Sequence, residues 1–211
     1  MTTQHRHKRK DGLRRQAQIM SLAMRLFAEK GYHSTSVDDI ITAAQIVKGT
    51  FYLHFKSKQD LLNSIVDTHL NLLYESLKIL DISLPRPLDE IRQLYSDVGA
   101  QLMQDPELKV FVKLMLREVM GHDSGFLNKI NSFFMGMAQL FSQYITKAQD
   151  EGRIIKSIDP TITSYSIIGS VKEVLFHWAV MDEKLDIQKS INTMIEIYFT
   201  GLIEQPSKEV R

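Results

Sequence analysis

Residues 36–55, SVDDIITAAQIVKGTFYLHF, contain the pattern that decides the fold of this chain. The apolar residues of the first half recur at the spacing of one stripe along an α-helix: Val37, Ile40, Ile41 and Ala44. Residues 45–47 interrupt this stripe, and a second helix opens at Lys48, where Phe51 and Phe55 recur one turn apart. The stretch therefore predicts two short helices joined by a tight turn.

A further helix is predicted directly upstream. Its apolar face consists of Ile19, Ala23, Leu26 and Phe27. Gly31 ends this helix, as a C-terminal glycine commonly does. The helices then share one small core, and the second motif helix keeps hydrogen-bond donors on its outward side: Lys48, Thr50, Tyr52 and His54. Such side chains contact phosphates and base edges, so the stretch is a candidate helix-turn-helix for DNA.

The same residues resemble the DNA-binding domain of TetR-type transcriptional regulators. The resemblance runs from Ile19 to Leu62 with its spacing kept, and covers roughly the first third of the chain. The rest is similar to that family only in helical layout and in fragments such as residues 151–154, EGRI. Two residues depart from the family pattern: Gln45 stands where glycine is usual, and Val47 where a small polar residue caps the recognition helix. They predict a slightly strained turn and the loss of a cap that normally contributes about 1 kcal/mol.

Composition and charge limit the classes of protein to which this chain can belong. The chain has 211 residues, of which 44% are hydrophobic, which is ample for a buried core. It has no cysteine and no long apolar run, so we expect a cytoplasmic protein that does not bind membranes. Residues 1–58 hold 11 Lys and Arg against 4 Asp and Glu, a net +7, whereas residues 59–211 hold 15 against 21, a net −6. The phosphate-binding surface is expected at the N-terminal end.

The helical pattern predicts an all-α chain of about nine helices in two domains. Residues 1–12 form a basic arm, which as a run of like charges should be disordered without DNA. Residues 13–72 form the helix-turn-helix domain, and residues 73–211 a helical domain for effector binding and dimerisation. A helix from Lys58 to about Leu80 links the two.

Residues 130–146 carry no charge, which predicts a central helix buried on all sides. Methionine and aromatic residues are abundant in this region; an ordinary core explains many of them, but they also suit an adaptable apolar cavity. By the resemblance, such a cavity would hold a small, hydrophobic effector. The candidate lining residues are Phe111, Met115, Phe133, Met137, Phe141, Tyr165, Glu173 and His177.

The last two predicted helices are a candidate dimer interface. Small residues among larger apolar ones let helices approach closely, and in TetR-like proteins the equivalent pair forms a four-helix bundle across the dimer. A core within one protomer is the alternative. The candidate interface residues are Ile168, Leu175, Ile191, Ile195, Tyr198, Phe199 and Leu202.

We interpret the chain as a dimeric TetR-like repressor that binds a palindromic or pseudo-palindromic operator and is released by its effector. The residues expected at double-stranded DNA are Arg6, Lys8, Arg9, Thr35, Ser36, Gln45, Lys48, Gly49, Thr50, Tyr52, His54 and Lys58. A constitutive, ligand-independent DNA-binding or architectural protein is the alternative. A helical enzyme is a third hypothesis, but no nucleophile motif and no metal-ligand spacing of histidines supports it, so we expect no catalytic residue, metal or cofactor.

Overall fold

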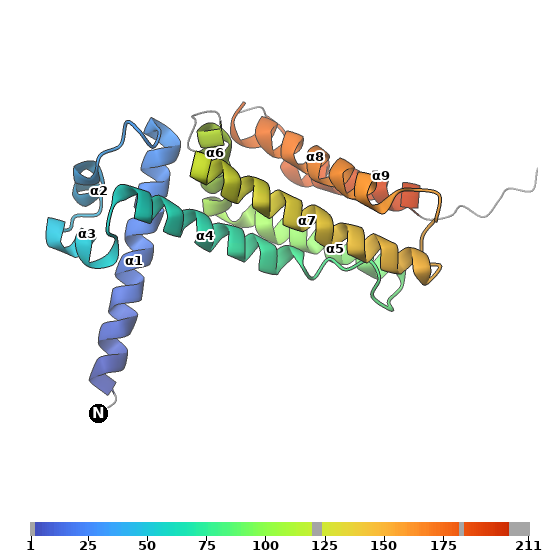
Figure 1. Ribbon diagram of the computed structural model, residues 1–211, viewed down its shortest axis with the longest axis horizontal. Helices are drawn as coiled ribbons and strands as arrows, with labels where there is room; N and C mark the ends of the chain where they lie inside the picture. Colours follow the sequence, from blue (N-terminus) through green and yellow to red (C-terminus); the bar gives the residue numbers. More distant parts are fainter. Residues whose placement is uncertain (1–2, 120–123, 182–183, 203–211) are drawn as a thin grey trace, which may run out of the picture. The chain divides into compact units, whose positions relative to one another are not determined.

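The computed structural model describes residues 3–119, 124–181 and 184–202 of the chain. All regular secondary structure in these ranges is helical, which confirms the predicted all-α class (Figure 1). The helices are α1 (Thr3–Lys30), α2 (Val37–Ala43), α3 (Lys48–His54), α4 (Lys58–Leu77), α5 (Leu88–Gln104), α6 (Pro106–Val119), α7 (Ser124–Asp150), α8 (Pro160–Ala179) and α9 (Ile187–Leu202).

Helix α1 is longer than the sequence pattern suggested. It begins at Thr3, so the basic segment that we expected to be a disordered arm forms the first turns of a 28-residue helix. Lysine and arginine are good helix formers, and extending an existing helix avoids the cost of starting a new one. The helix ends at Gly31, whose φ of 92° lies in the region that favours glycine.

Of the described residues, 3–71, 107–119 and 124–126 form one compact unit. Its core contains Phe27 of α1, Phe51 of α3 and Phe55, all almost completely buried. Helix α6 belongs to this unit: its Glu107 accepts a hydrogen bond from the Ser21 hydroxyl of α1. The N-terminal unit is therefore larger than the 13–72 domain expected from the sequence.

The α4–α6 contact within this unit is aromatic. The ring of Phe111 on α6 stacks on the ring of His69 on α4, with ring centroids 4.6 Å apart and planes inclined by 20°. Phe111 is fully buried. Because a side chain of α4 supplies one face of this stack, α6 is part of the core around α4.

Residues 72–106 and those from 127 onward form the second unit. Helix α9 lies between α5 and α8 and packs on both (Figure 1). Its Phe199 is buried and meets the ring of Tyr95 on α5 edge to face, with 5.3 Å between ring centroids. The Tyr95 hydroxyl donates a 2.7 Å hydrogen bond to the carbonyl of Leu80, and burial raises the pKa of this phenol above its ordinary value.

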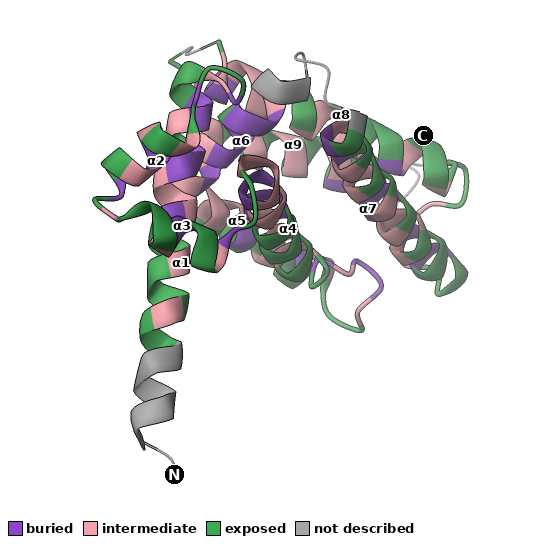
Figure 2. Ribbon diagram, turned by 60° about the vertical axis from the view of Figure 1, so that its left-hand side comes forward, coloured by how far each residue is buried: buried purple, intermediate pink, exposed green. Residues whose placement is uncertain are grey.

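The expectation that residues 130–146 are buried on all sides is wrong. They form the middle of α7, but exposed residues recur along one side of that helix (Figure 2). These exposed residues are Asn131, Ser132, Met135, Gln139, Gln143 and Thr146. Neutral amide and hydroxyl side chains hydrogen-bond to water as charged ones do, so the absence of charge did not imply burial.

Candidate nucleic-acid interface

A capping box fixes the start of α2. The Ser36 side chain accepts a 3.0 Å hydrogen bond from the backbone N–H of Asp39, and the Ser36 backbone N–H donates to the Asp39 carboxylate at 2.8 Å. The Ser36 hydroxyl also donates to that carboxylate, at 2.6 Å. The hydrogen bonds from the hydroxyl and the backbone of Ser36 hold the pKa of Asp39 below its ordinary value. Ser36, expected at DNA, therefore has a structural role in the cap.

The turn between α2 and α3 has the two features that its sequence predicted. Gln45 has a φ of 52°, in the left-handed region where a non-glycine residue is strained. Val47 is the N-cap of α3 and provides no side-chain hydrogen bond to it. Both expectations are confirmed, and α3 is held by packing rather than by its cap.

Two phenylalanines orient α3. Phe51 is fully buried and Phe55 nearly so, with 5.8 Å between their ring centroids. The opposite side of the helix is exposed and includes Lys48, Gly49 and Tyr52 (Figure 2). The expected donors Lys48 and Tyr52 thus lie on the surface, whereas Thr50 and His54 are half-buried.

Thr35 and Lys58 were expected at DNA, and the structure places both inside the unit. Thr35 is fully buried and donates its hydroxyl hydrogen to the carbonyl of Gly31 at 2.8 Å. The Lys58 ammonium donates to the carbonyls of Tyr32 and Thr35, each at 2.8 Å, and lies 4.3 Å from the centre of the Tyr32 ring. These contacts hold the α1–α2 loop against α4, so we correct both assignments to scaffold residues.

The basic residues of α1 extend the positive surface. The side chains of Arg6, Lys8 and Arg9 are outside the part of the chain that the structure describes. On the next turns, Lys10 and Arg14 are exposed. The role of the N-terminal basic residues in DNA binding stays a prediction.

One exposed residue of α3 was missed by the sequence reasoning, which selected hydrogen-bond donors. Leu53 is 80% exposed, the highest value among the large apolar side chains that the structure describes. The signal was available in the helical period, because Leu53 is two positions from the buried Phe51 and so faces away from the core.

The candidate effector residues are divided between the two units. Phe111 and Met115 are buried in α6 of the N-terminal unit, whereas the others lie on α7 and α8 of the second unit. Met137 is fully buried and Phe133 half-buried on α7. Their placement agrees with an ordinary core as well as with a cavity wall.

Two of the effector candidates on α8 are corrected. Tyr165 and Glu173 are exposed, and the carboxylate of Glu173 lies 3.1 Å from Nε2 of His177, one turn along the same helix. Glu173 and His177 therefore form a pair on the helix surface. Tyr165 and Glu173 are not lining residues of an interior site.

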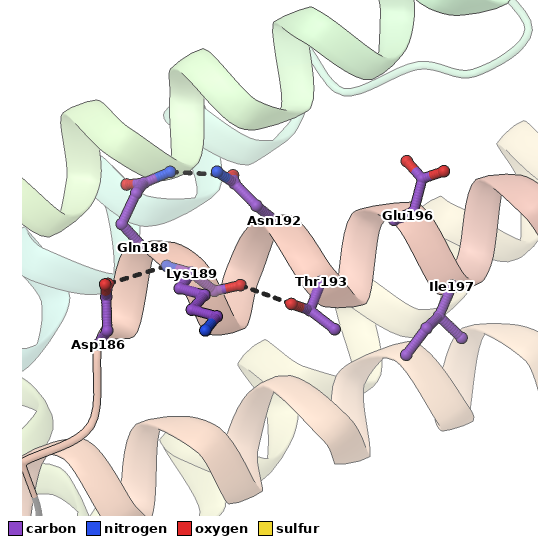
Figure 3. A pocket seen from close by; sticks show the side chains of 7 residues that line it. All are labelled: Asp186, Gln188, Lys189, Asn192, Thr193, Glu196 and Ile197. Carbon is purple, nitrogen blue, oxygen red and sulfur yellow. Dashed lines mark hydrogen bonds between the residues drawn. The ribbon is translucent and has the colours of Figure 1, made fainter.

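An open groove of about 570 Å³ lies on α9, and none of the predicted effector residues lines it (Figure 3). The lining residues are Asp186, Gln188, Lys189, Asn192, Thr193, Glu196 and Ile197. Most are polar, and Gln188 donates to Asn192 across one turn at 3.0 Å.

Several predicted interface residues face the interior of their own protomer. Phe199 and Leu202 are buried, and Ile195 packs on the same core cluster. The Tyr198 hydroxyl lies 2.8 Å from the Ser170 hydroxyl of α8. The apolar stripe of α9 was identified correctly, and it packs on α5 and α8. Phe199 and Leu202 are therefore corrected from interface to core.

The outward side of the α8–α9 pair carries other apolar residues. Ile162 and Tyr165 of α8 are 66% and 55% exposed, and Ile197 of α9 is 63% exposed. The exposed positions of α8 include Gly169, and those of α9 include Gly201. Of the sequence candidates, Ile168 and Leu175 are half-buried.

Two other kinds of feature are absent from the described ranges. No group of three or more His, Asp or Glu residues there is arranged to hold a metal ion. No described helix is both long and apolar enough to cross a membrane.

Comparison with known protein families gives matches along most of the chain. The model of bacterial regulatory proteins of the tetR family matches residues 19–65. The model of the C-terminal region of YsiA-like proteins matches residues 70–201.

Individual relatives agree with these matches. The fatty acid metabolism regulator protein of Bacillus subtilis is 25% identical over 185 residues, which cover 88% of this chain and 94% of the relative. The negative transcriptional regulator IcaR of the Staphylococcus aureus biofilm operon is 30% identical over 147 residues, 64% of this chain and 70% of IcaR. The structure of the transcriptional regulator FadR of B. subtilis in complex with stearoyl-CoA aligns with a TM-score of 0.70 and 26% identity, covering 88% of this chain and 98% of FadR.

Proposed function

The chain belongs to the TetR family of transcriptional regulators, and from this premise we propose that it is a dimeric repressor whose operator affinity is controlled by a small hydrophobic effector. The observation that carries the proposal is the arrangement of α3. Its inner side is fixed by Phe51 and Phe55, while its outer side is exposed and includes Lys48 and Tyr52. A short helix held in this way is suited to enter a major groove.

Charge supports DNA as the partner of this surface. The first 58 residues carry a net charge of +7, on a chain whose total is +1. Binding to phosphates releases counterions, so the affinity for DNA should fall steeply as the salt concentration rises.

Dimerisation would match the symmetry of the operator. Helix-turn-helix dimers place their recognition helices about 34 Å apart, one turn of DNA, and therefore read palindromic half-sites. The exposed apolar residues Ile162, Tyr165 and Ile197, with Gly169 and Gly201 among them, form the surface that we propose for the seam. Ile197 also lines the open groove on α9, and in this proposal the partner protomer covers that part of the groove.

The effector is proposed to be a fatty acyl compound, because the relative FadR was solved with stearoyl-CoA. Buried apolar side chains on α7, such as Met137, suit an acyl chain better than a sugar or a phosphate. To lower operator affinity a hundredfold, the effector must favour the non-DNA state by about 2.7 kcal/mol.

The test begins with selection of duplexes from a random DNA library by the full-length protein. The selected duplex is then used in gel shifts with stearoyl-CoA, free coenzyme A or an extract of hydrophobic metabolites. Release by stearoyl-CoA but not by coenzyme A would support the whole proposal. Sequence-specific binding that is indifferent to all of these additions would favour the constitutive DNA-binding alternative, and no enrichment of any sequence would overturn the DNA-binding function.

A further inference from the structure

We propose that Leu53 contacts thymine methyl groups in the major groove and is the main apolar determinant of operator sequence. This inference rests on the proposed DNA-binding function and extends it to the recognition chemistry of one residue. It starts from the geometry of α3, where successive residues turn by about 100° around the axis. Gly49 and Leu53 are each two positions from the buried Phe51, so they lie one turn apart on the line that faces directly away from the core.

Hydrogen-bond donors flank this line rather than occupy it. Lys48 and Tyr52 lie on one flank of α3 by the same helical period. Thr50 and His54 lie on the other flank and are half-buried. The side chains best suited to phosphates are therefore placed at the edges of the helix, where the walls of a groove would be. The centre of the outward face is left to Leu53.

Gly49 leaves room for a molecule outside the protein to approach this line closely. A Cβ atom added at Gly49 would meet no other protein atom within 4 Å, and the residue is not among those with positive φ. Neither packing nor backbone conformation therefore requires glycine, which is unfavourable in a helix. The absence of a side chain at this point lets a ligand reach the α3 backbone, one turn from Leu53.

The apolar side chain of Leu53 is suited to contact the methyl group of thymine. Leu53 is 80% exposed and has no polar atom in its side chain, so it cannot hydrogen-bond to a base or a phosphate. Among the base edges in the major groove, thymine presents a methyl group, which apolar side chains contact. The positive charge of residues 1–58 favours DNA over an apolar protein surface as the occupant.

Thymine and uracil differ by this methyl group alone, which makes the test specific. The wild-type protein is first used to select duplexes from a random DNA library. In the selected duplex, each thymine is then replaced in turn by deoxyuridine, symmetrically in both half-sites, and affinities are measured for wild type, Leu53→Ala and Leu72→Ala. Leu72 on α4 is also an exposed leucine, with 60% of its surface exposed, and it controls for the loss of a surface leucine. Circular dichroism melting checks that each variant is folded.

At one thymine position, deoxyuridine should weaken wild-type binding by roughly fourfold per half-site, the effect of one buried methyl group. The same replacement should leave the affinity of Leu53→Ala unchanged, while Leu72→Ala should respond as wild type does. Selective DNA binding with no thymine position showing this pattern would overturn the role of Leu53 and leave the proposed function standing. Failure of the wild type to select any DNA would instead refute the proposed function, and this inference with it.

Discussion

Gly49 is the residue at which stability and function are expected to be opposed. It lies within α3 with open space around its Cα, so alanine fits the fold without a clash. Gly49→Ala should raise the free energy of unfolding by about 0.5–1 kcal/mol, because glycine is costly within a helix. The added methyl group would nevertheless keep DNA away from the backbone and lower operator affinity by about tenfold.

Urea unfolding and gel shifts on the same protein preparation measure both effects. Gly136→Ala is the matched control, since its Cβ would also meet no atom within 4 Å and it lies on α7. It should gain similar stability and keep full operator affinity. Unchanged DNA binding by Gly49→Ala would contradict a close approach at this position.

At the scale of the element, the start of α2 should depend on pH through Asp39. The pKa of its carboxyl is lowered from 3.8 by hydrogen bonds from Ser36, so the ionised form stabilises the folded state. This stabilisation is fully present above the unfolded-state pKa of 3.8 and is lost as the pH falls through the lower folded-state pKa.

Asp39→Asn should therefore be less stable than wild type at pH 6, and the two should converge only once the pH has fallen below the lowered folded-state pKa of Asp39, where both side chains are neutral. Denaturant midpoints measured from pH 7 to pH 2.5 give the comparison. Asp38→Asn shares the first turn of α2 but not the capping box, and should show a smaller difference. A gap between Asp39→Asn and wild type that is constant with pH would argue against the capping contribution.

Lys58 joins the start of α4 to the α1–α2 loop. Replacing it distinguishes a scaffold role from a contact with DNA. Lys58→Met removes the hydrogen bonds to the carbonyls of Tyr32 and Thr35 and should cost about 1–3 kcal/mol of stability. The slope of log affinity against log salt concentration should stay as in wild type, whereas a lost phosphate contact lowers it by about 0.9.

Lys56→Met is the control, because the Lys56 side chain is exposed at the neighbouring surface. It should change stability by no more than about 0.5 kcal/mol. A reduced salt slope with unchanged stability for Lys58→Met would restore Lys58 to the DNA interface.

At the scale of the whole molecule, the proposed seam predicts which substitution gives monomers. Ile197→Asp places a carboxylate where the partner protomer would cover it, and an unpaired buried charge costs several kcal/mol. The variant should be folded and monomeric by light scattering. Phe199→Asp does not test the seam, because Phe199 is core and its loss should unfold the second unit.

Met135→Asp is the control. Met135 is also an exposed apolar residue, but it lies on α7, away from the proposed seam residues, so this variant should remain a dimer. An intact Ile197→Asp dimer would place the interface elsewhere on the molecule. Loss of dimers should also weaken operator binding, because each protomer alone contacts one half-site.

The features that depend on neighbours within a turn or two could be predicted from the amino-acid sequence. It located the helix-turn-helix, the end of α1 at Gly31, the strained turn at Gln45 and the uncapped start of α3 at Val47. Helical period, glycine conformation and capping are local properties, so the residues that set them lie close together in the chain. Family membership followed from the same local motif.

The partners that side chains meet from distant parts of the chain became known from the three-dimensional packing. The Lys58 ammonium lies on carbonyls 26 and 23 residues away, Glu107 reaches Ser21, and the apolar stripe of α9 faces α5 and α8 within one protomer. An amphipathic pattern predicts that one face of a helix is buried, but it does not predict which element covers that face. Burial against any apolar surface gives a similar gain in free energy. Packing places Phe199 and Leu202 in the core of one protomer, and we therefore propose the seam at Ile162, Tyr165 and Ile197.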